Sequence, residues 1–166
     1  MLTIVLGAPG SGKSTIARRL RSTLPGCAVI DWDDFMPAVE ALGGRDVRTS
    51  VDLWAPYGDL VRSVVTALSN VPVVVLGVRT PLELGDWPGA RWVLLDCDDD
   101  ERRRRLEQRP PHEVDDALTD AEAYRGLGLE VIDSTGRTVG EVADEIAEVL
   151  DRPNCAGLRA PGLGPP

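Results

Sequence analysis

Lysine is almost absent from this sequence, and the position of its single copy is informative. Lysine and arginine together number 18 in the 166 residues, and Lys13 is the only lysine. A guanine-specific GTPase of the common design needs a lysine in an N-K-x-D motif, which this chain cannot supply. The composition therefore excludes that class of switch, and it raises the question of why a lysine is kept at position 13.

Cysteines and long apolar runs are also scarce. Cys27, Cys97 and Cys155 lack CxxC spacing, so neither a disulfide framework nor a zinc site is indicated, and we expect two core thiols and one thiol near the C-terminus. No apolar run is long enough to span a membrane, and the N-terminal MLTIVLGAPG lacks the charged start of a signal peptide. We expect a cytoplasmic protein with no membrane partner.

An excess of positive charge is missing as well. The formal net charge is −9, whereas binding along a nucleic acid requires a basic face. A small-molecule partner is therefore expected rather than a nucleic acid, and nothing in the sequence indicates an oligomeric state. With 43% hydrophobic and 27% charged residues, the chain has the composition of one ordinary globular domain.

Short, β-branched and nearly continuous apolar segments recur along the chain. This pattern is typical of strands that are buried on both faces of a parallel sheet. Segments with helical periodicity lie between them, so the pattern predicts an α/β protein, a three-layer α/β/α sandwich with right-handed crossovers. The predicted strands are residues 2–6, 27–31, 71–76, 91–96 and 129–133, and the predicted helices are residues 13–24, 34–42, 56–69, 98–109 and 138–150.

The last predicted helix has a clear start and a clear end. Thr138 and Glu141 have the spacing of a capping box. The positions expected to dock on the sheet are Val139, Val142, Ile146 and Val149. The sequence then becomes rich in proline and glycine without apolar periodicity, so we predict one domain over residues 1–150 and a flexible tail over residues 151–166.

The segment GAPGSGKS explains the single lysine. It matches G-x-x-x-x-G-K-[ST] completely, follows a predicted strand and opens a predicted helix. In such a loop the backbone N–H groups bind phosphate, Lys13 reaches the β- and γ-phosphates, and Ser14 binds magnesium. A forked guanidinium does not replace a compact ammonium here. The predicted phosphate-binding residues are Gly7, Ala8, Pro9, Gly10, Ser11, Gly12, Lys13, Ser14 and Thr15.

With this loop, the sequence resembles the P-loop kinases of the nucleoside-monophosphate-kinase type, a group that includes adenylate, shikimate, gluconate and chloramphenicol kinases. The resemblance covers residues 1 to about 150 in length, element order and loop placement. It implies a P-loop NTPase fold with a five-stranded parallel sheet in the order 2-3-1-4-5. It also implies ATP and Mg²⁺ as cofactors, and a lid that carries arginines.

An acidic turn, VIDWDDF, follows the second predicted strand at the edge of the sheet where α/β folds bind ligands. The resemblance implies that Asp33 accepts the proton of an acceptor hydroxyl and that Asp31 helps to position magnesium, with Asp34 and Trp32 near the acceptor. The alternative is that Asp33 or Asp34 only caps the helix that starts near Phe35.

The third predicted strand departs from the usual pattern. Leu76 and Gly77 stand where a Walker B acid is expected, so the magnesium ligand must come from elsewhere, which favours Asp31. Shikimate-type kinases also carry glycine in this region, and the resemblance implies that Gly77 approaches the transferred phosphate.

Acidic residues 98–101 precede arginines 102–105 and Arg109 on one predicted helix. The helix dipole and i, i+4 pairing account for this order without any function. The resemblance implies in addition a short lid near residues 110–122. Under this interpretation Arg105 and Arg109 close over ATP and Arg109 is catalytic. The other three arginines of this predicted helix are then solvated.

The roles of two further segments are not decided by the sequence. Gly136 and Arg137 follow the last strand, where relatives bracket the adenine, but DSTGRT is equally a turn and helix cap. Residues 43–58 occupy the place of the family's acceptor-binding segment. The candidate acceptor residues are Trp32, Arg45, Arg48, Trp54, Tyr57 and Arg79, and the alternative for Trp54 and Tyr57 is packing beneath the next helix.

The leading hypothesis is an ATP-dependent kinase that phosphorylates a hydroxyl of a small-molecule acceptor. The catalytic residues are then Lys13, Asp33 and Arg109. One alternative is a nucleoside monophosphate kinase, because Arg45 and Arg48 suit an anionic acceptor. The other alternative is a non-catalytic regulator that binds ATP.

Overall fold

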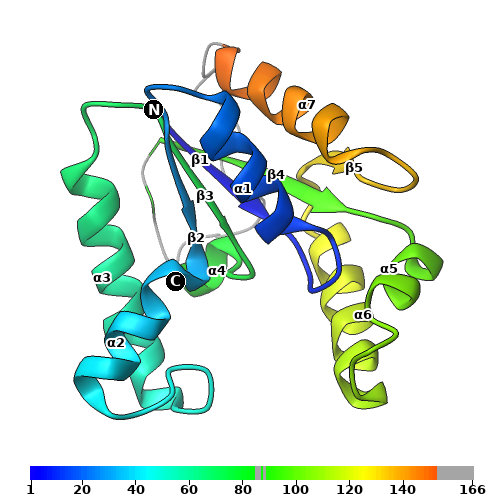
Figure 1. Ribbon diagram of the computed structural model, residues 1–166, viewed down its shortest axis with the longest axis horizontal. Coiled ribbons are helices and arrows are strands. Elements are labelled where there is room, and N and C mark those ends of the chain that lie inside the picture. Colours follow the sequence, from blue (N-terminus) through cyan, green and yellow to red (C-terminus); the bar gives the residue numbers. More distant parts are fainter. Residues whose placement is uncertain (85–86, 88, 153–166) are drawn as a thin grey trace, which may run out of the picture.

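A computed structural model describes residues 1–84, 87 and 89–152, and these residues form a twisted sheet enclosed by helices (Figure 1). The sheet has the order β2-β3-β1-β4-β5 and all its pairs are parallel, which confirms the predicted topology. The strands are β1 (Leu2–Leu6), β2 (Ala28–Asp31), β3 (Val73–Gly77), β4 (Ala90–Asp96) and β5 (Glu130–Asp133).

Helices cover both faces of this sheet, so the three-layer prediction is confirmed (Figure 1). The α-helices are α1 (Lys13–Thr23), α2 (Met36–Gly43), α3 (Trp54–Ala67), α4 (Pro81–Leu84), α5 (Asp99–Arg105), α6 (Pro111–Arg125) and α7 (Val139–Asp151). Two 3-10 turns, η1 (Trp32–Phe35) and η2 (Val51–Leu53), precede α2 and α3.

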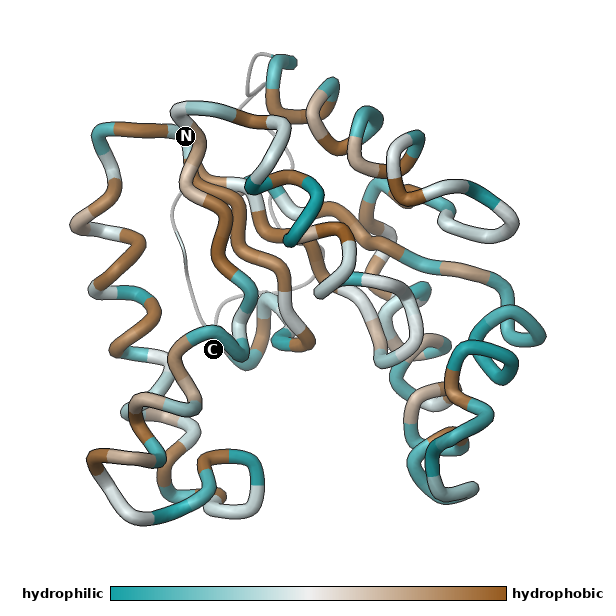
Figure 2. Tube along the Cα trace, viewed as in Figure 1, coloured by the Kyte–Doolittle hydropathy of each residue, from teal (hydrophilic) through white to brown (hydrophobic). Residues whose placement is uncertain are grey.

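The central strands β1 and β3 are almost entirely apolar because each buries both of its faces. In β3, Val74 and Leu76 pack with α1 and α7, whereas Val73 and Val75 pack with α3 and the η1 region. Successive side chains of a strand point to opposite faces, so a strand between two helical layers needs apolar residues at every position. Figure 2 shows this as continuous brown strands at the centre of the molecule.

The capping box at the start of α7 is present as predicted. The Thr138 hydroxyl accepts from the Glu141 amide at 3.3 Å, and the Glu141 carboxylate accepts from the Thr138 amide at 2.8 Å. Val142, Ile146 and Val149 are buried against the sheet and α1. Val139 differs from the expectation: it is the first residue of the helix, and 39% of its surface is exposed.

The chain between β4 and β5 differs from the sequence prediction. A single helix was expected over residues 98–109, but α5 ends at Arg105, and a second helix, α6, begins at Pro111. Proline fits the first turn of a helix, so the Pro110-Pro111 pair separates the two. α6 buries only Ala117, Ala121 and Tyr124, a contact stripe that is too small to give a strong apolar period.

The predicted tail lies mostly outside the described residues. α7 extends one residue further than predicted, to Asp151, and the Arg152 side chain pairs with Glu130 at 2.7 Å. Residues 153–166, including Cys155, are outside the description; of the other thiols, Cys97 is buried and Cys27 is half-buried. Within the described chain, no helix is long and apolar enough to cross a membrane.

Candidate functional site

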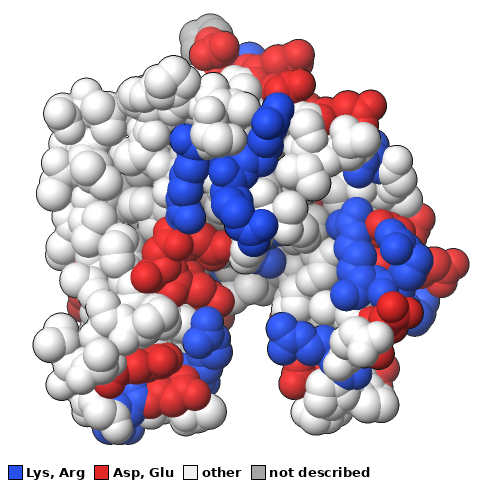
Figure 3. All heavy atoms as spheres, in the orientation of Figure 1, with Lys and Arg blue, Asp and Glu red and all other residues white. Residues whose placement is uncertain are grey.

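A cleft of about 630 Å³ opens at the carboxyl edge of the sheet, where the P-loop, β2, β3, α5 and α6 converge. Figure 3 shows the molecule hollowed between the lobe that carries α2 and the lobe that carries α5 and α6. This is the place where open α/β sheets bind ligands. The cleft is lined by Pro9, Gly10, Gly12, Lys13, Ser14, Thr15, Asp31, Trp32, Asp33, Gly77, Val78, Arg105, Leu106, Arg109, Glu113, Asp116, Ala117 and Asp120.

The P-loop between β1 and α1 has the backbone that an anion site requires. Gly10 and Gly12 have φ angles of +83° and +99°, which only glycine adopts without strain. Within the described chain, the amides of Gly10, Gly12, Lys13 and Ser14 have no hydrogen-bond acceptor. Unpaired amides at a helix N-terminus bind phosphate, so this predicted segment is arranged as expected.

Lys13 extends along the loop to which it belongs. Its ammonium donates to the carbonyl oxygens of Gly7 at 2.6 Å and Ala8 at 3.0 Å. Burial lowers the pKa of Lys13 from 10.5 to about 8, and the nearby Asp31 carboxylate opposes this shift. The cleft therefore holds a desolvated cation, and the charge of a phosphate group would stabilise its protonated form.

Arginines of α5 hold the outer side of the P-loop. Arg105 donates to the carbonyls of Gly10 at 3.1 Å and Ser11 at 3.3 Å, and also to Ser134. Arg102, which is completely buried, donates to the Pro9 carbonyl at 2.6 Å. Arg102 was expected to be a solvated arginine, and this expectation is wrong. Its burial depends on contacts with residues more than 90 positions away, which no local pattern reveals.

The three aspartates of the acidic turn have different surroundings. Asp31 is buried at the end of β2 and caps η1 by accepting from the Asp33 amide at 3.3 Å. Asp34 completes this capping box through the Asp31 amide and pairs with Arg21, so it is engaged in local structure and does not line the cleft. Asp33 lines the cleft and its carboxylate lies 2.9 Å from the Arg48 guanidinium.

Ser14 and Asp31 fit the requirements of a magnesium ligand pair. Both line the cleft beside Lys13, and one carboxylate oxygen of Asp31 has no hydrogen-bond partner within the described chain. Magnesium in nucleotide sites is held by one or two protein groups and by the phosphates. Among the described residues, no group of three or more histidine, cysteine or acidic side chains is arranged to hold a metal ion.

Gly77 and Trp32 are in contact at the floor of the cleft. A Cβ atom at position 77 would lie 3.0 Å from the Cβ of Trp32, so the glycine makes room for the indole. Tyr57 is buried, donates its hydroxyl to the Trp32 carbonyl and meets the indole edge-on at 5.6 Å between ring centroids. Tyr57 does not line the cleft, so of the two alternatives for this residue the structure agrees with packing rather than with acceptor binding.

The other candidate acceptor residues lie outside the cleft lining. Arg45 is exposed and forms two hydrogen bonds with Asp52, at 2.9 and 2.7 Å. The Arg79 guanidinium stacks 3.9 Å from the ring centroid of Trp54 and pairs with Glu83 at 2.6 Å. Among the residues that the structure describes, Arg48 contacts the cleft lining through its ion pair with Asp33.

α6 contributes an acidic wall that the sequence analysis missed. Glu113, Asp116 and Asp120 line the cleft at helical spacing, together with Ala117. Burial is the main cause that raises the pKa of the Asp120 carboxyl, and repulsion from Asp116 is the next largest. Arg109, the predicted lid arginine, also lines the cleft, and its exposed side chain pairs with Glu113 at 3.2 Å.

Gly136 and Arg137 do not line the cleft. Gly136 has a φ angle of +63° in the turn after β5. The Arg137 guanidinium donates to the carbonyls of Asp133 at 2.8 Å and Glu141 at 3.1 Å, and it pairs with Glu145. In this structure both residues shape the turn and the start of α7.

Comparisons with known proteins agree with this geometry. A family model described as an AAA domain matches residues 4–125. No significant match was found among curated proteins.

Solved structures of kinases share the fold. A sugar kinase from Janibacter sp. gives a TM-score of 0.63 at 19% identity, covering 90% of this chain and 94% of that chain. Shikimate kinase from Aquifex aeolicus gives 0.59 at 20% identity, covering 91% and 96%, and a gluconokinase from Sinorhizobium meliloti gives 0.57 at 20%, covering 89% and 90%. The resemblance to P-loop kinases that the sequence indicated is thus confirmed in the fold.

Proposed function

The chain belongs to the AAA domain family, and from this membership and the geometry of the cleft we propose that it is an ATP-dependent kinase that phosphorylates a hydroxyl of a small-molecule acceptor. One observation carries the proposal: the P-loop with Lys13 and the carboxylate of Asp33 line the same cleft. The solved structures with this fold include a shikimate kinase, a gluconokinase and a sugar kinase, which supports a small acceptor.

The residues of the P-loop are suited to hold the triphosphate of ATP. Its unpaired amides and the Lys13 ammonium can donate hydrogen bonds to the anionic oxygens of the triphosphate. Arg102 and Arg105 donate to the carbonyls of the same loop. Ser14 and Asp31 would hold magnesium, which when bound neutralises charge on the phosphates. Arg109 would reach the phosphates only after its exposed ion pair with Glu113 opens.

Asp33 is the proposed general base. The acceptor's hydroxyl oxygen forms a bond to the γ-phosphorus as the bond to the ADP oxygen breaks, and the hydroxyl proton passes to the Asp33 carboxylate. Because Arg48 pairs with Asp33 at 2.9 Å, it is positioned to orient that carboxylate at the cleft. Gly77 and Trp32 provide the adjoining floor.

The charges of the cleft favour an alcohol over a nucleoside monophosphate as acceptor. Carboxylates of Asp33, Glu113, Asp116 and Asp120 line it, and Arg45, one of the two arginines expected to suit an anionic acceptor, is engaged with Asp52 outside. A phosphate group bound beside these carboxylates, without the P-loop amides and Lys13 that hold the triphosphate, would be repelled. The acidic wall thus supports the hydroxyl-phosphorylating hypothesis.

The experiment measures ATP consumption by the protein with a panel of alcohols and a panel of nucleoside monophosphates. We expect turnover with an alcohol, and we expect Asp33→Asn to lower kcat by about 100-fold or more while nucleotide affinity is kept, because only the proton acceptor is lost. Turnover with monophosphates alone would contradict the proposal and indicate the nucleotide kinase.

The matched control is Asp52→Asn, which removes an exposed carboxylate of η2 that lies outside the cleft. It should leave kcat unchanged. Nucleotide binding without turnover on either panel, with Asp33→Asn indistinguishable from the wild type, would instead indicate a regulator that binds ATP.

A further inference from the structure

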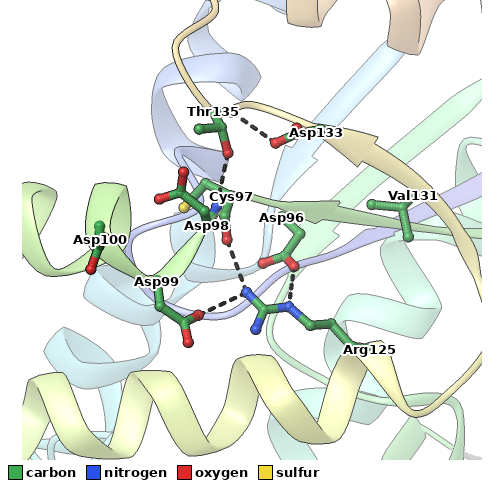
Figure 4. Close-up of a pocket in the computed structure, with 9 residues that line it drawn as sticks. All are labelled: Asp96, Cys97, Asp98, Asp99, Asp100, Arg125, Val131, Asp133 and Thr135. Atoms are coloured by element: carbon green, nitrogen blue, oxygen red, sulfur yellow. Dashed lines mark hydrogen bonds and ion pairs between the residues drawn. The ribbon is translucent and has the colours of Figure 1, made fainter.

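A single buried carboxylate joins two arginines behind the cleft. Asp96 ends β4 and is 7% exposed. One of its oxygens pairs with Arg102 of α5, and the other accepts from Arg125 of α6 at 2.6 Å. Figure 4 shows Asp96 and Arg125 together in a second hollow on the molecule, with Asp99 and Cys97 beside them.

On one side, this carboxylate is connected to the P-loop. Arg102 is fully buried and extends from Asp96 to the Pro9 carbonyl at 2.6 Å. Its side chain also packs under the loop, because a Cβ at Gly10 would lie 3.0 Å from the Arg102 Cγ. Arg102 therefore fixes the position of the loop from below, through both a charge-assisted hydrogen bond and packing.

On the other side, the carboxylate is connected to the cleft wall. Arg125 is the last residue of α6, the helix whose Glu113, Asp116 and Asp120 line the cleft. Besides Asp96, it donates to the Cys97 carbonyl and to Asp99, each at 2.9 Å. These bonds fasten the C-terminal end of α6 to the end of β4 (Figure 4).

We propose that Asp96, with Arg102 and Arg125, forms a positioning network that couples α6 to the shape of the phosphate-binding loop. None of the three side chains lines the cleft, so their effect on a bound anion must act through the loop and the helix. The proposal deepens the proposed function, because the loop is taken to bind phosphate.

Burying the Asp96–Arg102 ion pair costs more free energy than a feature that only fills space would need. A buried arginine and a buried aspartate lose their hydration, and that loss offsets much of their mutual attraction. Apolar residues would fill the same space at a lower cost, but they would not hold the Pro9 carbonyl. Arg102 therefore donates a hydrogen bond to the loop, which an apolar side chain cannot do.

The decisive variant is Arg125→Gln, because Arg125 forms no hydrogen bond with the P-loop within the described chain. Asp96 keeps Arg102 as a partner in this variant, so the buried carboxylate is not left alone. One readout is hydrogen exchange of the Ser11 amide, which is bonded to the Ala8 carbonyl at 3.2 Å. The other readout is the dissociation constant of magnesium tripolyphosphate, a probe that engages only the phosphate site.

In Arg125→Gln we expect faster exchange at Ser11 and a dissociation constant about 3- to 10-fold higher, the range typical of residues that act through a contact network. Arg125→Lys keeps the positive charge and should recover part of the loss. The matched control is Arg103→Gln on α5, where an exposed arginine pairs, among the described residues, only with Asp100. It should match the wild type in both readouts.

The outcomes separate this proposal from the proposed function. Ser11 exchange in Arg125→Gln equal to that of Arg103→Gln would overturn the network, whether or not the wild type binds phosphate. Faster exchange with an unchanged dissociation constant would also overturn it, since α6 would then not affect the shape in which the loop binds phosphate. A wild type that binds neither tripolyphosphate nor MgATP would overturn the proposed function, and the exchange measurement would still decide the network.

Discussion

The sequence predicts the position of Lys13, and the structure shows how the surroundings of Lys13 change its pKa. The motif alone places it in the phosphate loop. The structure adds that burial lowers its pKa to about 8. A solvated lysine would stay charged across the physiological range, whereas Lys13 loses its proton at mildly alkaline pH.

This pKa predicts how nucleotide affinity changes with pH. Above about pH 8 the free protein holds neutral Lys13, so binding a phosphate must also take up a proton, and the dissociation constant should rise by about tenfold per pH unit. Calorimetry in buffers of different ionisation enthalpy measures that proton uptake. Lys13→Met should bind weakly at every pH, and an affinity that stays flat through this range in the wild type would contradict the assignment.

The same shift has a defined sign for stability. The folded pKa of Lys13 lies below its ordinary value of 10.5, so between these two values the unfolded chain holds a proton that the folded chain lacks. The contribution of this group to the free energy of unfolding therefore rises with pH in that window. Below it, the buried charge is a constant cost.

Residue types alone did not assign roles within the acidic turn. The sequence placed Asp31, Asp33 and Asp34 at the correct edge of the sheet, but it offered only Asp33 or Asp34 as a helix cap, whereas the N-cap is Asp31. In the structure Asp31 and Asp34 form the capping box and Asp33 remains available. Adjacent carboxylates are equivalent in composition, and only the backbone direction of the turn distinguishes them.

At the scale of elements, strong amphipathic patterns were predictive and weak ones were not. α7 carries a complete capping box and a buried stripe, and its capping residues Thr138 and Glu141 were predicted correctly. α6 was missed because its buried positions are mainly alanines, while its acidic positions face the cleft. A helix that lines a cleft does not show the polarity of a helix that faces bulk solvent.

The capping box gives a prediction about α7. Thr138→Ala removes the hydroxyl that accepts from the Glu141 amide, and we expect a loss of about 1 kcal/mol in the free energy of unfolding, measured by urea denaturation. The control is Thr66→Ala, whose hydroxyl bonds a carbonyl within α3 and should change stability by less than about 0.5 kcal/mol. Equal denaturation midpoints for the two variants would contradict the role of the cap.

For the whole molecule, stability depends on the layer between the sheet and the pair α1 and α7. Leu20 of α1 is completely buried there. Leu20→Ala is therefore expected to cost about 2–5 kcal/mol, because it removes apolar contacts and leaves a cavity in a close-packed core. Thermal and urea unfolding measure this loss.

The control for this prediction is Leu42→Ala on α2. The Leu42 side chain is 90% exposed, so the same substitution there should leave stability almost unchanged. A Leu20→Ala protein as stable as Leu42→Ala would mean that this layer contributes little to the fold.

The sequence by itself determined the alternation of strands and helices, the parallel sheet, the phosphate loop and the edge at which the acidic turn lies. These features follow from residues that are close together in the chain, through burial periods, glycine conformations and helix starts.

Only the tertiary structure decided that Asp33 pairs with Arg48, that α6 forms an acidic wall, and that Arg102 lies buried beneath the P-loop. Arg102 and Pro9 are 93 positions apart, and neighbouring arginines of the same helix are exposed. Whether a charged side chain is buried depends on what the fold brings against it. The local sequence does not identify that distant partner, so the pattern of residues 102–105 alone could not distinguish the buried Arg102 from the exposed Arg103 and Arg104.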